Sequence, residues 1–385
     1  MRKDFLPFSK PSVSETAIAD VCDSIRSGWL AMGPKTVDFE KKFAGYVGAK
    51  FAISVNSATA GLHLAVMAVT EPGDEVITTP MTFASTVNAI IYSNAVPILA
   101  DIDPVTFNID PKKIEEKITA KTKAIIPVHF AGRPCDMDAI EKIAAKYNLA
   151  IIEDSAHALG ASYHGRKIGA GKGARHIAVF SFHPTKNITT GEGGMITTDD
   201  EKAADQMSVQ RQNGMDKGAW NRFGAKGKSH YDIFRPGLKY QMMDIQAAIG
   251  RDQLKYLEQF NSRRTAIVER YNDAFADIKG LTVPAPIETN CVHSWHIYTP
   301  LIESDELGFT RDEFMEKMKA YNIGTAYHYQ ALHLFSAYAR ITGLKKGDMP
   351  VSELIGEKIV SLPLFPAMSD QDVADVIEAV KNVCK

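Results

Sequence analysis

Short apolar segments alternate with amphipathic segments from residue 51 to about residue 200. The apolar segments 51–55, 75–78, 96–101, 122–129, 149–153, 177–182 and 195–198 are typical of strands, and the segments 59–69, 83–92, 111–118 and 137–147 have helical spacing. Strands separated by helices imply right-handed crossovers, and segments that are apolar almost throughout fit strands buried on both faces. The pattern therefore predicts an α/β protein with a mainly parallel, seven-stranded sheet flanked by helices.

The segments outside this alternation predict two flanking regions. Helical spacing covers residues 14–27 and 37–47, before the first strand. The elements expected after the sheet are a long helix at 243–275, a short strand near 281, a strand at 295–301, a helix at 311–320, a strand at 325–329 and a helix at 370–383. We expect a large α/β domain over residues 1–245 and a smaller C-terminal α+β domain over residues 246–385.

The composition is that of an ordinary globular protein. Hydrophobic residues make up 45% and charged residues 23% of the 385 positions, and the formal net charge is −2, so neither nucleic acid nor an anionic membrane surface is indicated as a partner. The four cysteines lie far apart without a Cys-x-x-Cys pair, which argues against a zinc site or a disulfide framework. No apolar signal core follows the first residues. We therefore expect a cytoplasmic protein without a membrane span.

The segment 177–198 carries the most specific chemistry. Its apolar strand ends before Pro184, and Lys186 follows in a loop bounded by Gly191, Gly193 and Gly194. A lysine between two core strands lies close to apolar surface, which disfavours the charged form and lowers the pKa. A neutral amine of this kind attacks an aldehyde to form a Schiff base. A solvated loop lysine is the alternative for this segment taken alone.

Three further groups lie at the predicted carboxyl ends of strands, where ligands bind in an open parallel sheet. Thr59 opens a helix whose free N–H groups and dipole favour a phosphate, although a plain N-cap explains Thr59 as well. Phe83 is able to stack on a flat ring, or it is an ordinary core residue. Asp154 needs a partner such as a protonated pyridine nitrogen, or it caps the next turn. His157 either orients that carboxylate or is structural.

Together these groups match the needs of pyridoxal phosphate. Thr59 and Ser181 supply a phosphate site, and Phe83 supplies a platform for the ring. Asp154 supplies the anion for the ring nitrogen, and Lys186 supplies the amine. The sequence has no Gly-x-x-x-x-Gly-Lys-Ser/Thr motif and no Gly-x-Gly-x-x-Gly after the first strand. The histidines at 293, 296, 328 and 333 lack the i, i+4 spacing of a helical zinc site, so no metal is expected.

These residues resemble those of the DegT/DnrJ/StrS family of sugar-nucleotide aminotransferases, and the resemblance extends over nearly the whole chain. It is carried by Ser27-Gly28-Trp29, Ser57-Ala58-Thr59-Ala60-Gly61-Leu62-His63, Glu153-Asp154-Ser155-Ala156-His157-Ala158, Phe180-Ser181-Phe182-His183, Lys186-Asn187-Ile188-Thr189 and Gly191-Glu192-Gly193-Gly194. Within the family, the chain is most similar to the members that form UDP-4-amino-4-deoxy-L-arabinose. The resemblance implies the fold type I architecture of pyridoxal-phosphate-dependent transferases and a homodimer with active sites at the interface.

The resemblance also implies the residues that contact the cofactor. They are Ala58, Thr59, Phe83, Asp154, His157, Ser181, Lys186 and Gln241. Lys186 is the catalytic residue among them, since it forms the Schiff base and moves the proton. Asp154 pairs with the pyridine nitrogen, and His157 lies near the ring.

The remaining implied contacts concern the phosphate and the face of the ring. Ala58, Thr59 and Ser181 bind the phosphate in this reading. Phe83 stacks on the ring, and Gln241 reaches the phosphate from the neighbouring subunit. The related enzymes carry tryptophan in place of Phe83 and asparagine in place of Gln241. Both replacements are compatible with the same contacts.

The resulting prediction is a pyridoxal-phosphate-dependent aminotransferase that carries the amino group of L-glutamate to a nucleotide-linked keto sugar and releases 2-oxoglutarate. A UDP-linked C4-ketone for a cell-surface polysaccharide or lipopolysaccharide is favoured, and a C3-ketone is the alternative. Trp29, His328 and His333 are the expected substrate contacts. Lys186 and Asp154 together argue against a non-catalytic regulator. Related dehydratases carry histidine in place of the Schiff-base lysine, so a dehydratase is disfavoured too.

Overall fold

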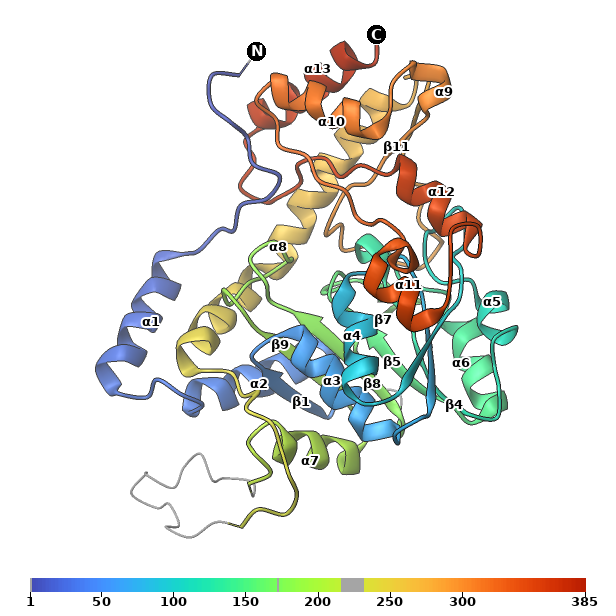
Figure 1. Cartoon of the computed structure of the whole chain (residues 1–385). Coiled ribbons are helices and arrows are strands. Elements are labelled where there is room, and N and C mark those ends of the chain that lie inside the picture. The colour runs from blue at the N-terminus through green and yellow to red at the C-terminus, as the bar shows by residue number, and fades with distance from the viewer. Residues whose placement is uncertain (1, 172, 216–231) are drawn as a thin grey trace.

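A seven-stranded sheet lies at the centre of the computed structural model, which describes residues 2–171, 173–215 and 232–385 (Figure 1). Its strands are β1 (Phe51–Val55), β2 (Glu75–Thr78), β3 (Val96–Leu99), β4 (Thr122–Ile126), β5 (Ala150–Asp154), β8 (His176–Ser181) and β9 (Gly194–Thr198), in the spatial order β1-β9-β8-β5-β4-β2-β3. β9 runs antiparallel to both of its neighbours, and the other pairs are parallel. The predicted α/β fold with a mainly parallel seven-stranded sheet is confirmed.

Helices cover both faces of this sheet. They are α2 (Pro34–Val47), α3 (Ala58–Val69), α4 (Ala84–Tyr92), α5 (Pro111–Glu115), α6 (Met137–Tyr147) and α7 (Glu201–Gln210), with α1 (Glu15–Ser27) farther out. Neighbouring residues of one strand pack against opposite layers. In β5, Ile152 joins the apolar cluster of α3, α4 and α7, whereas Ile151 joins the cluster of α5 and α6. This two-sided burial explains why the strands are apolar almost throughout.

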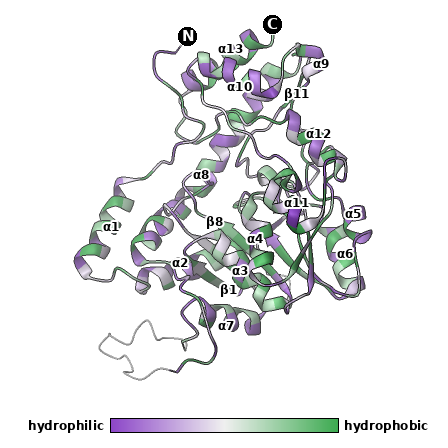
Figure 2. Cartoon of the chain, viewed as in Figure 1, coloured by the Kyte–Doolittle hydropathy of each residue, from purple (hydrophilic) through white to green (hydrophobic). Residues whose placement is uncertain are grey.

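Helix α3 lies unusually close to the sheet. A Cβ on Gly61 would lie 2.7 Å from Cγ1 of Val179 in β8, so only glycine permits this approach. Figure 2 shows the hydrophobic residues gathered in α3 and the strands beside it, whereas the outer helices carry more hydrophilic residues. The close approach places the N-terminus of α3 at the carboxyl end of β8, where the predicted site residues lie.

A second region is built around the far half of the long helix α8 (Asp244–Phe275), which runs from beside α1 and α2 to the opposite end of the molecule (Figure 1). The other elements of this region are β10 (Leu281–Thr282), β11 (Leu301–Ile302), α9 (Ser304–Leu307), α10 (Arg311–Ala320), α11 (Ser336–Thr342), α12 (Pro350–Lys358) and α13 (Asp370–Val383). An apolar cluster joins α8, α10 and α13 and includes Leu6 from the N-terminal segment. The division into residues 1–245 and 246–385 stays a prediction.

Two of the predicted strands are wrong in extent or in kind. The segment predicted at 295–301 contributes only its last residue to β11, and the segment predicted at 325–329 is not a strand. Apart from Leu301, each of these segments pairs with another only at an isolated bridge, Tyr298 with Leu362 and Ala326 with Ser361. Alternation along a sequence predicts extended backbone but does not show whether a neighbouring strand is available. The helices α7, α9, α11 and α12 and the hairpin β6 (Ser162–Tyr163) to β7 (Arg166–Lys167) were not predicted.

Candidate active site

Lys186 lies in the loop that joins β8 to β9. The backbone N–H of Thr190 donates to the carbonyl of Phe182 at 3.0 Å, which closes the base of the loop. In the middle of the loop, Nδ2 of Asn187 donates to the carbonyl of Ser294 at 2.8 Å. The loop is therefore fixed at its base and beside the lysine, so Lys186 has a defined position at the carboxyl end of β8.

The environment of Lys186 favours a neutral amine. Burial lowers the pKa of Lys186 from 10.5 to about 8, and the carboxylate of Asp154 opposes this shift. About half of the amine is then neutral at pH 8, and the neutral form is the nucleophile in Schiff-base chemistry. The direction of the pKa shift agrees with the one expected from the sequence.

Asp154 is the last residue of β5 and has a buried side chain. Its Oδ2 accepts a hydrogen bond from Oγ1 of Thr86 at 2.7 Å, and its Oδ1 accepts one from the backbone N–H of Ala156 at 3.2 Å. Burial raises the pKa of Asp154 despite these two donors and the charge of Lys186. A cationic partner would stabilise the ionised form of a buried carboxylate of this kind.

A second carboxylate, on Glu153, sits beside Asp154 but has a different role. Its two oxygens contact Nε2 of His129 at 2.7 Å and Nε2 of His176 at 2.5 Å. Burial alone would raise the pKa of Glu153, but these two imidazoles hold it well below its ordinary value. Glu153 is thus satisfied within the protein, where it joins residues from β8 and from the segment after β4. Asp154 is the carboxylate left for a ligand.

His157 lies in the turn after β5, within a cluster of rings. Its Nδ1 accepts a hydrogen bond from the backbone N–H of Ala131 at 3.2 Å, and its Nε2 lies 3.1 Å from the hydroxyl of Tyr329. Burial lowers the pKa of His157 well below its ordinary value, and the charge of Lys186 lowers it further. The ring therefore stays neutral, with its proton on Nε2 directed at Tyr329.

The N-terminus of α3 meets the ends of β8 and β9. Oγ of Ser57 accepts a hydrogen bond from the N–H of Ala60 at 3.1 Å, which leaves the N–H groups of Ala58 and Thr59 as free donors at the end of the helix. A Cβ on Gly194 would lie 2.8 Å from the backbone nitrogen of Ala58, so a side chain there would fill this corner. Ser181, the last residue of β8, pairs with Gly194 in the sheet. This corner combines helix-end donors with a hydroxyl, as an anion site requires.

Phe83 and Gln241 lie at the edges of this arrangement. Phe83 precedes α4 and is 62% exposed, and its ring centroid lies 6.4 Å from that of Tyr329. Oε1 of Gln241 is buried but has no hydrogen-bond partner among the described residues. An exposed aromatic ring and an unsatisfied amide oxygen leave both side chains available for further contacts.

The three expected substrate contacts are in different surroundings. Trp29 is half-buried in the loop after α1. Nδ1 of His328 lies 2.8 Å from Oγ of Ser361, and burial followed by the charge of Lys186 lowers the pKa of His328 to about 4. His333 is enclosed, and its Nε2 contacts Oε1 of Glu353 at 2.8 Å. The structure thus brings His328 near Lys186, and it surrounds His333 with protein; their contacts with substrate stay predictions.

Several residues near Lys186 had no predicted role. Tyr329 and His296 contribute a hydroxyl and an imidazole, and Thr86 holds Asp154 from α4. Thr86 lies three residues after Phe83, so its position on the first turn of a helix that starts at the strand end was an available signal. Tyr329 and His296 lie in the segments predicted as strands at 325–329 and 295–301, and the irregular backbone found there does not give the alternating orientation of a strand.

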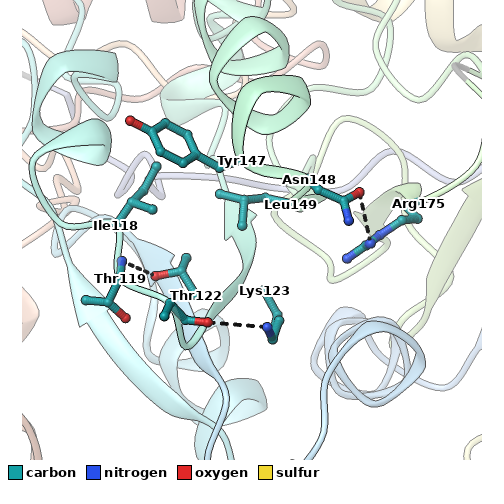
Figure 3. Close-up of a pocket in the computed structure, with 9 residues that line it drawn as sticks. Ile118, Thr119, Thr122, Lys123, Tyr147, Asn148, Leu149 and Arg175 are labelled. Atoms are coloured by element: carbon teal, nitrogen blue, oxygen red, sulfur yellow. Dashed lines mark hydrogen bonds between the residues drawn. The ribbon is translucent and has the colours of Figure 1, made fainter.

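A cavity of about 480 Å³ opens at the opposite edge of the sheet (Figure 3). It is lined by Ile118, Thr119, Ala120, Thr122, Lys123, Tyr147, Asn148, Leu149 and Arg175. Thr122 begins β4, and Leu149 and Arg175 immediately precede β5 and β8. The cavity therefore lies at the amino ends of the strands, and the carboxyl ends carry Lys186 and Asp154.

The described residues contain neither a candidate metal centre nor a helix suited to a bilayer. No group of three or more His, Cys, Asp or Glu side chains in residues 2–171, 173–215 and 232–385 is placed to hold a metal ion. Within the same ranges, no helix combines the length and the apolar character needed to cross a bilayer.

The sheet order, the loop lysine, the buried Asp154 and the free end of α3 together define a fold type I enzyme that depends on pyridoxal phosphate. Residues 11–381 match the model of the DegT/DnrJ/EryC1/StrS aminotransferase family. The chain belongs to this family and is a pyridoxal-phosphate-dependent sugar aminotransferase.

Relatives of known sequence and structure agree with this assignment. The whole chain is 49% identical to an uncharacterized protein of Methanocaldococcus jannaschii and 47% identical to the spore coat polysaccharide biosynthesis protein SpsC of Bacillus subtilis, and it covers 98% of each. Spr1654 of Streptococcus pneumoniae, a candidate sugar aminotransferase in its PLP form, matches with a TM-score of 0.89 and 33% identity over 99% of this chain and 98% of that one. PseC of Helicobacter pylori, an aminotransferase in pseudoaminic acid biosynthesis, matches with a TM-score of 0.90 and 27% identity over 99% of both chains.

The residues of this chain fit the cofactor of the family. Within the described residues, the hydrogen bonds to the buried carboxylate of Asp154 come from Thr86 and Ala156 and not from a cationic side chain, and the N-terminus of α3 presents backbone N–H groups near the hydroxyl of Ser181. When bound, pyridoxal phosphate supplies an electron-withdrawing ring, which no side chain provides. Lys186, Asp154 and the N-terminus of α3 are the groups that would hold its aldehyde, ring nitrogen and phosphate.

Proposed function

We propose that the protein transfers the amino group of L-glutamate to the ketone of a nucleotide-linked sugar. The proposal is carried by one observation, the weakly basic amine of Lys186 beside the buried carboxylate of Asp154, in a chain of the sugar aminotransferase family. An amine with a pKa of about 8 is able to accept a proton from the donor carbon and return it near neutral pH. Lys186 is the proposed general base and acid in both half-reactions.

We assign the remaining predicted residues to holding the cofactor. Ala58 and Thr59 supply helix-end N–H groups, and Ser181 supplies a hydroxyl, for the phosphate. Phe83 covers one face of the ring. His157 lies near the ring in its neutral form, because burial lowers its pKa. In these assignments, each charged part of the cofactor faces either a group of opposite charge or the favourable end of a dipole.

The active unit that we propose is a homodimer. The resemblance to the family supports this proposal, and the buried Oε1 of Gln241 needs a donor that the described part of a single chain does not supply. In the dimer, Nε2 of Gln241 of each subunit would donate to the cofactor phosphate of the other. Cofactor affinity would then depend on assembly.

Gln241→Ala is therefore expected to weaken pyridoxal phosphate binding by about tenfold, which is the loss of one hydrogen bond to a charged group. Lys186 should still react with the cofactor at saturation, because its own surroundings are unchanged. The measurement is a titration of cofactor-free dimer with pyridoxal phosphate, followed by visible absorbance. Gln371→Ala, at an exposed position on α13, is the matched control. An unchanged dissociation constant, or full activity in a monomer, would contradict the proposed geometry.

For the substrate, we favour a UDP-linked sugar with its ketone at C4. The similarity to the aminoarabinose-forming members supports this choice. The similarity to SpsC suggests a cell-surface polysaccharide as the destination. A nucleotide diphosphate is a bulky anion, and Trp29, His328 and His333 are the proposed contacts. The free state of Cys22, Cys135, Cys291 and Cys384 supports a reducing, cytoplasmic location.

The substrate is tested with a panel of UDP-, GDP- and dTDP-linked C3- and C4-keto sugars, with glutamate as donor. Amination of a UDP-linked C4-ketone, measured by the mass of the product, is the expected result. Visible absorbance that shifts with glutamate, together with released 2-oxoglutarate, identifies the first half-reaction independently of the sugar. Amination of a C3-ketone alone would overturn the substrate assignment and leave the aminotransferase assignment in place.

A further inference from the structure

The imidazole of His296 contacts the amine of Lys186. Its Nε2 lies 3.5 Å from Nζ of the lysine. The side chain is buried, and Nδ1 has no hydrogen-bond partner among the described residues. Buried polar atoms are nearly always paired, so an unpaired one suggests a functional constraint. Contacts between catalytic groups are often long before ligands bind and shorten afterwards.

The position of His296 is fixed by three separate contacts. Its backbone N–H donates to the carbonyl of Ala131 at 3.0 Å, and its carbonyl accepts from Nη1 of the buried Arg264 at 3.0 Å. Its ring centroid lies 4.3 Å from that of His157. A side chain held in this way is preorganised, because it spends no free energy on finding its orientation.

The segment that carries His296 is also tied to the lysine loop. Asn187, the neighbour of Lys186, donates to the carbonyl of Ser294 at 2.8 Å, and Oγ of Ser294 donates to the carbonyl of His157 at 2.7 Å. A Cβ on Gly132 would lie 2.3 Å from Oγ of Ser294, so this junction is closely packed. The distance between the imidazole and the lysine is therefore set by a shared framework.

We propose that His296 holds the Lys186 amine whenever that amine is not condensed with the cofactor, and that it is a positioning residue for transamination. Nε2 of His296 accepts an N–H from the lysine, and the proton of the neutral ring is on Nδ1. The lone pair of the neutral amine is then free to face the reacting carbon. This inference rests on the proposed function, in which the lysine leaves and rejoins the cofactor in every turnover.

The charges around Lys186 agree with an accepting imidazole. The groups that act on the lysine or respond to its charge are Asp154, His157, His183, His296, His328 and Tyr329 through its contact with His157. Burial lowers the pKa of each of these four histidines. They stay neutral near pH 7, so Nε2 of His296 keeps its lone pair. Asp154 is the anion of the group.

The test follows the amine of Lys186 in cofactor-free protein. Acetylation of Lys186 by acetic anhydride is measured against pH by mass spectrometry, and its midpoint should lie near 8 in the wild type. An acceptor stabilises the ammonium, so His296→Leu should lower the midpoint by about one pH unit. His296→Gln keeps an acceptor of similar reach and should restore at least half of this shift. His293→Leu removes a buried imidazole whose Nδ1 accepts from the N–H of Trp295 and should leave the midpoint unchanged.

A midpoint in His296→Leu that equals those of the wild type and of His293→Leu would overturn the proposal. If His296→Leu does not fold, His296→Asn replaces it, because asparagine is too short to reach Nζ and should show the same shift. The glutamate-dependent absorbance of the wild-type holoenzyme separates the two claims. Its absence would remove the proposed function without affecting the comparison of midpoints. A glutamate-dependent absorbance change together with an unchanged acetylation midpoint in His296→Leu would contradict only the role of His296.

Discussion

Lys186→Ala is expected to lower kcat by at least about 10⁴-fold, the upper range for the loss of one acid–base group. The lysine is also the nucleophile that joins the cofactor, so two functions are lost together. The helix end at α3, the hydroxyl of Ser181 and the carboxylate of Asp154 remain in the variant, so pyridoxal phosphate should still bind. The measurements are 2-oxoglutarate release and cofactor content after gel filtration.

Lys202→Ala is the matched control, since Lys202 is an exposed lysine on α7. It should retain full activity. A Lys186→Ala variant with near-normal transamination would remove the central assignment of the site. A variant that binds no cofactor at all would instead show that the covalent bond, and not the surrounding contacts, provides most of the affinity.

The seven strands of the sheet, and the edge of the sheet at which the reactive residues lie, were predicted from the sequence. The strands are mostly apolar because neighbouring residues such as Ile151 and Ile152 enter separate clusters on the two faces. The residues after each strand then had to lie at one edge, where Asp154 and Ser181 are found. The topology of the sheet alone, without any knowledge of side-chain contacts, predicted that these groups lie close together.

The irregular parts of the site could not be predicted in the same way. Tyr329 and His296 lie in segments predicted as strands, but their backbone is irregular and is paired near them only at isolated bridges, so the orientations expected from a period of 2 do not apply. The distinction between Glu153 and Asp154 likewise needed the structure. Both are carboxylates in one strand, but only Glu153 meets two imidazoles.

The same limit applies to the residues expected at the substrate. His328 and His333 are five residues apart, and similarity to the family assigns both to the substrate. The structure gives each a hydrogen-bond partner, Ser361 for His328 and Glu353 for His333, and the charge of Lys186 helps to lower the pKa of His328. Sequence similarity indicates which position corresponds to a site residue of the family. The burial of the side chain and its hydrogen-bond partners decide whether it is free to contact a ligand.

Asp154→Asn is expected to lower kcat by about 10²–10⁴-fold, because a neutral amide cannot hold a proton on the ring nitrogen of the cofactor. The same substitution should act on the lysine in the absence of cofactor. Asp154 raises the pKa of Lys186 against the effect of burial, so its removal should move the acetylation midpoint of Lys186 below 8. A carboxylate too far from the lysine to act on its charge would not produce this second shift.

The stability of this variant has a predictable sign. Burial raises the pKa of Asp154 above its unfolded value, so the carboxyl group favours folding below the unfolded pKa and loses this contribution as the pH rises through the folded pKa. At neutral pH the ionised group is a cost, and cofactor-free Asp154→Asn should unfold in urea at the wild-type concentration or a higher one. Asp101→Asn is the contrast, because Asp101 accepts hydrogen bonds from the N–H groups of Val351 at 3.0 Å and Ser352 at 2.9 Å and should lose stability but keep kcat. Asp154→Asn with a wild-type rate and a lower urea midpoint would show that Asp154 supports the fold and not the reaction.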